Sequence, residues 1–189
     1  MGHPHNADIY FSRAEVYYKQ GDKQQSLKDI DRVIILNSNY FEAYNDRAVI
    51  YEEQGKYELA KQDLNKAISI KSNYFKSYQN RGNVYAKLGL YDLAMLDFEK
   101  AMLLNENADN FRSRGIVYGY QGKFDQAIAD FSKAVLIDKN DASAYYNRAI
   151  CYFNEKKYLR SQQDVLKAQA LGLKVDQKLL DALKYFLSS

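Results

Sequence analysis

The chain has 189 residues, enough for one ordinary domain or one array of repeats. Hydrophobic residues make up 47% and charged residues 27%, a composition typical of folded proteins that argues against disorder. Lys and Arg number 27 and Asp and Glu 24, so the net charge of +3 gives no bulk-charge argument for nucleic-acid binding.

Residues 1–6 are expected to be a disordered terminus or a remnant of expression. Residues 1–5 show no apolar core and no cleavage pattern, so we do not expect them to be a secretion signal. His3 and His5 could touch a metal only weakly, since an ordered site needs about three or four converging ligands. No apolar run reaches the ~18–20 residues of a membrane helix. We therefore expect no membrane insertion and a cytoplasmic location.

An arginine recurs every 33 or 34 residues along the rest of the chain. An aromatic residue stands three positions before and four positions after each one, and the next residue is always Ala or Gly. A glycine stands eight positions after the first four arginines, whereas Lys156 takes this place in the fifth unit. The arginines are Arg13, Arg47, Arg81, Arg114 and Arg148. This periodicity predicts repeats over 7–40, 41–74, 75–107, 108–141 and 142–174.

Each repeat has the pattern of two helices. In the second repeat, Tyr44, Ala48 and Tyr51 have the i, i+4, i+7 spacing of one helical face. Gly55 then stands where a helix commonly ends on a left-handed residue without a Cβ atom. Residues 57–68 again carry apolar side chains three and four apart. The small residues allow the two helix backbones to approach closely, and the large ones fill the space beside them.

This pattern resembles the tetratricopeptide repeat, a helix-turn-helix unit of about 34 residues. The second repeat carries the likeness at Tyr44, Ala48, Tyr51, Gly55, Tyr57, Ala60, Leu64 and Ala67, and the third at Tyr78, Gly82, Tyr85, Gly89, Tyr91, Ala94, Phe98 and Ala101. The resemblance implies an all-α fold, a right-handed α-α superhelical solenoid of five repeats. The chain departs from the family pattern where the first repeat has Lys23, Ser26 and Val33 at usually aromatic or alanine places.

The segment 175–189 holds Leu179, Leu180, Leu183 and Phe186, which predicts one more amphipathic helix. A stack of repeats leaves an apolar end that a terminal helix can cover, so we interpret this segment as a capping helix. The alternative is a detachable helix that binds a partner.

An aspartate stands sixteen positions after every repeat arginine. These residues are Asp29, Asp63, Asp97, Asp130 and Asp164. Each could pair with the arginine of its own repeat or with that of the next repeat, across neighbouring helices. A charge relay is the alternative, but an active site is normally built once, so five copies indicate architecture. We expect Asp97→Ala to cost stability modestly and to leave partner binding unchanged.

The usual catalytic residues are missing from the repeats. Both histidines lie within the first five residues, so a His-based general base or triad is not expected. Cys151 is predicted to be a buried, inert thiol, and the glycine-rich stretch 115–122 lies within the helical frame rather than in a phosphate loop. We expect no enzymatic activity, no cofactor and no metal.

The resemblance implies that the first helices of the repeats line a concave groove that binds an extended peptide or a helix of a protein partner. Asn45, Asn80, Asn83 and Asn147 could hold a peptide backbone, because an amide both donates and accepts hydrogen bonds. The expected groove residues are Phe11, Glu15, Tyr18, Asn45, Val49, Glu52, Lys76, Gln79, Asn80, Asn83, Arg112, Ile116, Tyr120, Tyr146, Asn147, Ile150 and Phe153. Tyr146 and Phe153 are candidates for an apolar anchor pocket.

Other interpretations remain open. One interpretation is a groove that holds only solvent, and another is a self-assembling structural module. The chain is expected to be a monomer or a weak homo-oligomer. RNA binding, one base per repeat, is disfavoured by Glu15 and Glu52 on the expected groove. A family subgroup clamps the C-terminal carboxylate of chaperones through Lys, Asn and Arg. Whichever repeat is taken as the first of the clamp, this chain matches the subgroup at one position only, Lys76, Asn80 or Asn83, so we do not expect a chaperone-tail clamp.

Overall fold

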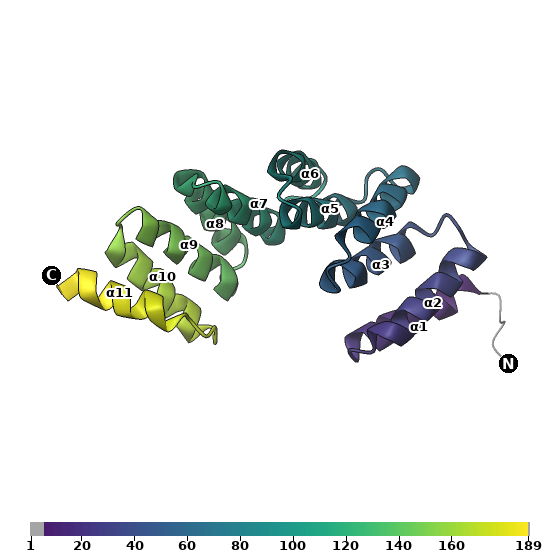
Figure 1. The fold of residues 1–189 in the computed structure, drawn as a ribbon, viewed down its shortest axis with the longest axis horizontal. Helices are drawn as coiled ribbons and strands as arrows, with labels where there is room; N and C mark the ends of the chain where they lie inside the picture. Colours follow the sequence, from purple (N-terminus) through teal and green to yellow (C-terminus); the bar gives the residue numbers. More distant parts are fainter. Residues whose placement is uncertain (1–5, 189) are drawn as a thin grey trace. The chain divides into compact units, whose positions relative to one another are not determined.

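The computed structural model describes residues 6–188, which form eleven α-helices and no strand (Figure 1). His3 and His5 lie outside the described residues. Asn6, expected to be disordered, instead caps the first helix, because its side chain accepts a hydrogen bond of 2.9 Å from the backbone N–H of Asp8. The helices are α1 (Ala7–Lys19), α2 (Lys23–Leu36), α3 (Phe41–Glu53), α4 (Tyr57–Ile70), α5 (Phe75–Lys87), α6 (Tyr91–Leu104), α7 (Ala108–Tyr120), α8 (Phe124–Ile137), α9 (Ala142–Asn154), α10 (Tyr158–Ala170) and α11 (Gln177–Ser188).

The chain forms two compact units. Unit 1 comprises residues 1–104 and contains the helix pairs α1–α2, α3–α4 and α5–α6. Unit 2 comprises residues 105–189 and contains α7–α8, α9–α10 and α11. The two helices of each pair pack against each other along their length, which confirms the helix-turn-helix pattern expected from the sequence.

A left-handed residue ends the first helix of each repeat. Gly55 has a φ of 72°, and its N–H donates to the carbonyl of Glu52, while the next N–H donates to Tyr51. Lys156 takes the corresponding place in the fifth repeat with a φ of 58° and makes the equivalent hydrogen bond to Phe153. The turn therefore survives without glycine, although a side chain in this conformation is strained.

The core of each repeat is matched in size across its two helices. Gly82 lies against the ring of Phe98, which is fully buried, and a Cβ atom at position 82 would lie 2.7 Å from the ring. Where the small residue is Ala48, its partner sixteen positions later is the smaller Leu64, also fully buried. A large ring therefore requires glycine opposite, and an aliphatic side chain permits alanine.

Helix α11 packs on α10 at the end of unit 2. Its Leu183 is 2% exposed and joins a core cluster with Val165 and Ala168 of α10. The ring of Phe186 stacks on Tyr158 at a centroid distance of 4.6 Å. This packing is that expected of a capping helix.

Candidate functional site

The five aspartates each pair with the arginine of their own repeat. In the second repeat, Nε and Nη2 of Arg47 donate to the two carboxylate oxygens of Asp63 at 2.7 Å each. The same two-point contact occurs in the other four repeats. Nη1 of Arg47 also donates to Asp31 of the preceding repeat at 2.7 Å. The pairs hold helices together in every repeat, which is an architectural role.

Two aromatic rings flank each of these arginines. The guanidinium carbon of Arg81 lies 5.7 Å from the ring centroid of Tyr78 and 5.7 Å from that of Tyr85. Hydrogen bonding to the buried Asp97 raises the pKa of Arg81 further above its ordinary value. The conserved spacing of aromatic, arginine and aromatic residues within this chain therefore builds a cation–π stack rather than a ligand site.

The thiol of Cys151 lies in the interior of unit 2. Cys151 is 3% exposed, and burial together with the nearby Glu155 raises the pKa of its thiol to about 11. The thiol is thus protonated at neutral pH, which makes it a poor nucleophile. Across residues 6–188, no three His, Cys, Asp or Glu side chains come together as metal ligands, and no helix is both long and apolar enough to cross a membrane.

The expected groove residues divide between the two units. Those of unit 1 lie on α1, α3 and α5, and those of unit 2 lie on α7 and α9. In unit 1, we call the exposed and half-buried side chains of these three helices the first-helix face. Glu15 and Lys76 are exposed on it, and Tyr18, Val49, Glu52, Gln79, Asn80 and Asn83 are half-buried. Phe11 packs on Tyr40 at a ring centroid distance of 4.9 Å.

Asn45 does not lie open on this face. Its side chain is 3% exposed, and its Oδ1 atom accepts hydrogen bonds of 3.2 Å from Ser77 Oγ and from Asn80 Nδ2. Its own amide nitrogen donates to Asp46. The expectation that Asn45 holds a peptide backbone is therefore corrected, because its amide links α3 to α5 inside unit 1.

The apolar anchor pocket expected at Tyr146 and Phe153 is filled by the protein's own side chains. The ring of Phe153 is covered by Tyr158 at 5.4 Å and by Phe186 of the capping helix at 6.0 Å. Tyr146 packs against the same core cluster. These two side chains therefore serve the packing of α11 rather than an open pocket.

The other groove residues expected in unit 2 differ in how far their side chains are exposed. Tyr120 and Ile150 are exposed, and Ile116 and Asn147 are half-buried. Arg112 forms an ion pair with Asp109 on its own helix and another of 3.0 Å with Asp141 next to α9. Arg112 is thus already neutralised by two carboxylates before any ligand arrives.

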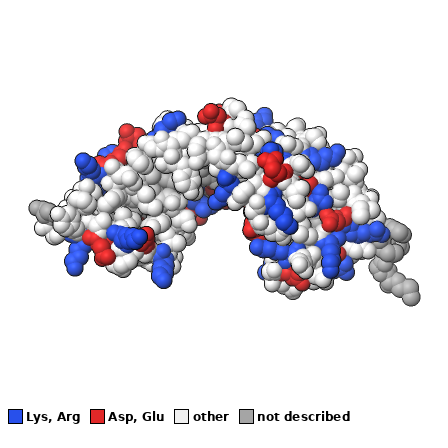
Figure 2. All heavy atoms as spheres, in the orientation of Figure 1, with Lys and Arg blue, Asp and Glu red and all other residues white. Residues whose placement is uncertain are grey.

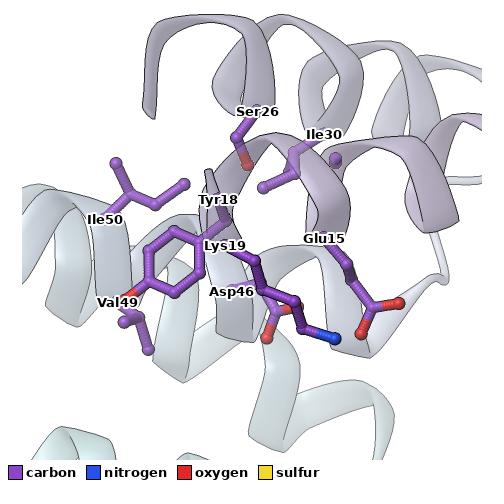
Figure 3. A pocket seen from close by; sticks show the side chains of 9 residues that line it. Glu15, Tyr18, Lys19, Ser26, Ile30, Asp46, Val49 and Ile50 are labelled. Carbon is purple, nitrogen blue, oxygen red and sulfur yellow. The ribbon is translucent and has the colours of Figure 1, made fainter. Parts of the chain in front are cut away.

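A cavity of about 130 Å³ opens on the first-helix face, among α1, α2 and α3 (Figure 3). Helices α1 and α3 contribute both apolar and charged side chains to its lining, and α2 contributes Ser26 and Ile30. The lining residues are Ala14, Glu15, Tyr18, Lys19, Ser26, Ile30, Asp46, Val49 and Ile50. Glu15, Tyr18 and Val49 were expected here as groove residues, whereas the inner lining by Ser26, Ile30 and Ile50 was missed. We call this cavity the socket.

The hydroxyl of Ser26 distinguishes the socket from the interior of the other repeats. Ser26 is 1% exposed, and its Oγ has no hydrogen-bond partner. Figure 3 shows the hydroxyl directed toward the other lining side chains. In the fifth repeat the corresponding Ser161 donates to the carbonyl of Ala149 at 2.8 Å. The signal in the sequence was a serine at a place where the middle three repeats have alanine.

One wall of the socket is held in place by hydrogen bonds. The hydroxyl of Tyr18 donates to Glu53 at 2.7 Å, and Lys23 pairs with the same carboxylate at 3.0 Å. Burial and the hydrogen bond to Glu53 raise the pKa of Tyr18 to about 12. Burial acts to raise the pKa of Glu53, but the hydrogen bonds from Tyr18 and Lys23 outweigh it and lower the pKa. The Tyr18 ring is thereby fixed as a rigid wall.

The mouth of the socket carries a carboxylate without an ion pair. Among the described residues, Asp46 has no basic side chain within salt-bridge distance, although it accepts a hydrogen bond from Asn45. Burial raises its pKa, and the charges of Glu15 and Glu42 raise it further, while Lys76 acts in the opposite direction. A cation placed here would be attracted by three carboxylates that Lys19 and Lys76 do not fully balance.

Comparison with known families decides the identity of the repeats. Models of the tetratricopeptide repeat match residues 7–40, 30–62 and 75–108, and a further TPR repeat model matches residues 50–89 and 115–155. The chain belongs to the tetratricopeptide repeat family. A search of curated proteins found no match.

Solved tetratricopeptide repeat structures share the fold at low sequence identity. PilW, described as a widely conserved type IV pilus biogenesis factor, is 18% identical with a TM-score of 0.87, covering 96% of this chain and 86% of PilW. PilF of Pseudomonas aeruginosa is 18% identical with a TM-score of 0.83, covering 95% of this chain and 88% of PilF. YrrB, described as a TPR protein with an unusual peptide-binding site, is 24% identical with a TM-score of 0.69, covering 95% and 93%. These similarities confirm the all-α helical repeat fold.

The surface charge of the repeats is mixed. Figure 2 shows Lys and Arg interspersed with Asp and Glu over the face in view.

Proposed function

We propose that this tetratricopeptide repeat protein is a non-enzymatic scaffold that binds an extended peptide or a helix of a protein partner on the first-helix face. Proteins with these repeats generally serve as interaction modules, and one structural neighbour is described as having a peptide-binding site. The proposal extends that general role to this chain and to this face.

The socket is the observation that carries the proposal. It combines an apolar lining with charged groups at its mouth and an unpartnered hydroxyl inside, which is the composition of a recognition pocket rather than of a closed core. At about 130 Å³ it is smaller than the ~300–1,000 Å³ of small-molecule sites, and it suits one side chain of a macromolecular partner. The half-buried amides of Asn80 and Asn83 continue the same face on α5.

Affinity capture from a lysate of the source cell tests the proposal. The face variant Glu15→Lys/Glu52→Lys reverses two charges on α1 and α3, and the matched control Asp92→Lys/Glu99→Lys reverses two exposed charges on the second helix α6. Both variants should melt like the wild type, because none of the four carboxylates forms a salt bridge among the described residues.

The expected result is a protein that the wild type and the control retain and the face variant loses. A captured protein that the control variant loses and the face variant retains would contradict the proposal. Self-association of the chain without any other captured protein would favour the structural module instead, and sedimentation at increasing concentration would show it.

A further inference from the structure

The socket differs from the equivalent place in the other repeats in a way that points to a specific guest. An unpaired buried hydroxyl is unfavourable, and alanine occupies this place at Ala60, Ala94 and Ala127. In the first repeat, the hydroxyl of Ser26 is buried, unpartnered and open to the cavity. A guest that places a hydrogen-bonding atom at Ser26 would satisfy it.

The size and lining of the socket limit what this guest can be. A cavity of about 150 Å³ accommodates a whole benzene, so a socket of about 130 Å³ that is open at its mouth takes most of one aromatic ring. Its walls of Ala14, Ile30, Val49 and Ile50 are apolar, and Tyr18 presents a ring held by its hydrogen bond to Glu53. A side chain with an aromatic body and a hydroxyl at its end matches both the walls and the Ser26 hydroxyl.

The charges at the mouth define the neighbours of this side chain. Glu15 and Asp46 line the socket, and Glu42 lies close enough to act on Asp46. Lys19 and Lys76 are the opposing cations, so the mouth carries three negative and two positive charges. A partner segment with basic residues beside its aromatic anchor therefore complements the mouth, and an acidic segment is repelled.

We propose that the socket binds a tyrosine side chain of a partner segment in which lysine or arginine residues flank the tyrosine. The tyrosine ring packs between Ile30, Val49 and Ile50, its hydroxyl hydrogen-bonds with Ser26, and the flanking cations lie near Asp46 and Glu15. This inference rests on the proposed function and specifies the chemistry of the partner.

Fluorescence anisotropy with short labelled peptides tests the proposal on the full chain. The probe has a central Tyr with lysines on both sides, and the comparison peptides replace Tyr by Phe or by Ala, or each lysine by Glu. We expect the Ala and Glu peptides to bind at least about 10-fold more weakly, and the Phe peptide about 3- to 10-fold more weakly through loss of one hydrogen bond.

Two variants assign these effects to residues. Ser26→Ala should abolish the difference between the Tyr and Phe peptides and keep the preference for either over Ala. Asp46→Asn/Glu15→Gln should weaken the lysine peptide about 10-fold and reduce its salt dependence, whereas the control Asp92→Asn/Glu99→Gln on α6 should not. Both acids of the control are exposed.

Several results would overturn the proposal. They are equal binding of the Tyr and Ala peptides, equal binding of the lysine and Glu peptides, an unchanged Tyr-to-Phe ratio in Ser26→Ala, or no binding of any peptide. The proposed function is tested by different evidence. It stands if the lysate capture shows a partner that is lost only with the face variant Glu15→Lys/Glu52→Lys.

Discussion

The contact between Gly82 and Phe98 allows a sharp prediction about the core of the third repeat. Alanine at position 82 would place its Cβ atom 2.7 Å from Cε1 and 2.9 Å from Cδ1 of the ring. Real Cβ contacts are essentially never shorter than about 3.0 Å, so the ring or a helix must move. The ring cannot turn away into solvent, because Phe98 is fully buried.

Two opposing effects set the magnitude for Gly82→Ala. Replacing a helical glycine by alanine gains about 0.5–1 kcal/mol in backbone entropy. Overpacking a dense core costs about 1–3 kcal/mol. We expect the free energy of unfolding to fall by about 1–2 kcal/mol. Gly119→Ala is the matched control, because the nearest atom to its Cβ is the Cys151 sulfur at 4.0 Å, so this variant should gain stability.

The double variant Gly82→Ala/Phe98→Leu recreates the Ala48–Leu64 pair of the second repeat. Phe98→Leu alone should cost about 1–2 kcal/mol through a cavity, and the added methyl group should fill part of it. Urea unfolding of the four proteins gives the coupling energy. We expect the double variant to lie within about 1 kcal/mol of the wild type. Additive losses in the two single variants would refute the size-matching argument.

Four further predictions concern single positions. Lys156→Gly should raise the free energy of unfolding by about 1 kcal/mol, because φ is 58° at this residue, and thermal melting measures it. Asp97→Ala should lower it by about 3 kcal/mol, more than the sequence suggested, because the carboxylate is buried and the Arg81 charge loses its partner; partner capture should be unchanged. Cys151 should react with a thiol reagent at pH 8 only after unfolding, since burial raises its pKa to about 11, and fast labelling of the native chain would contradict its burial. Asp46→Asn should stabilise the chain near neutral pH by about 0.5 kcal/mol. Burial raises the folded-state pKa of Asp46, so the charged carboxylate opposes folding above that pKa. The gain of the variant should therefore vanish as pH falls below the ordinary Asp range, and a gain that persists in acid would contradict this cause.

The repeat pattern made the fold accessible from the sequence. Each characteristic residue position recurs in several repeats, so a helix that is predicted in one repeat can be checked at the same positions of the others. The aromatic residues around Arg47 and Arg81 have helical spacing in the sequence, and an aspartate follows each arginine by sixteen positions. The sequence left two arginine partners open for each aspartate, because helix positions alone do not fix which of two neighbours is nearer. The structure selects the arginine of the same repeat.

The binding face was less accessible, because it depends on residues that occur once. Asn45 was expected to be open, but Ser77 stands where other repeats have Ala43 and Ala144, and its hydroxyl draws the Asn45 amide into the interior. In unit 2, Phe153 was expected to form a pocket, but the capping helix covers it. The socket is a space that remains between the large side chains of α1, α2 and α3. The helical periodicity of the sequence does not specify where such a space forms.

Site-specific photo-crosslinking tests the central claim, that the first-helix face of unit 1 binds a protein partner. A photoreactive residue is placed at Glu15, Val49 or Gln79 on this face, or at Leu59, Leu96 or Leu103, which are exposed on the second helices. The account predicts crosslinks to one partner protein from the first three positions and none from the other three. Crosslinks confined to the second-helix positions would contradict it.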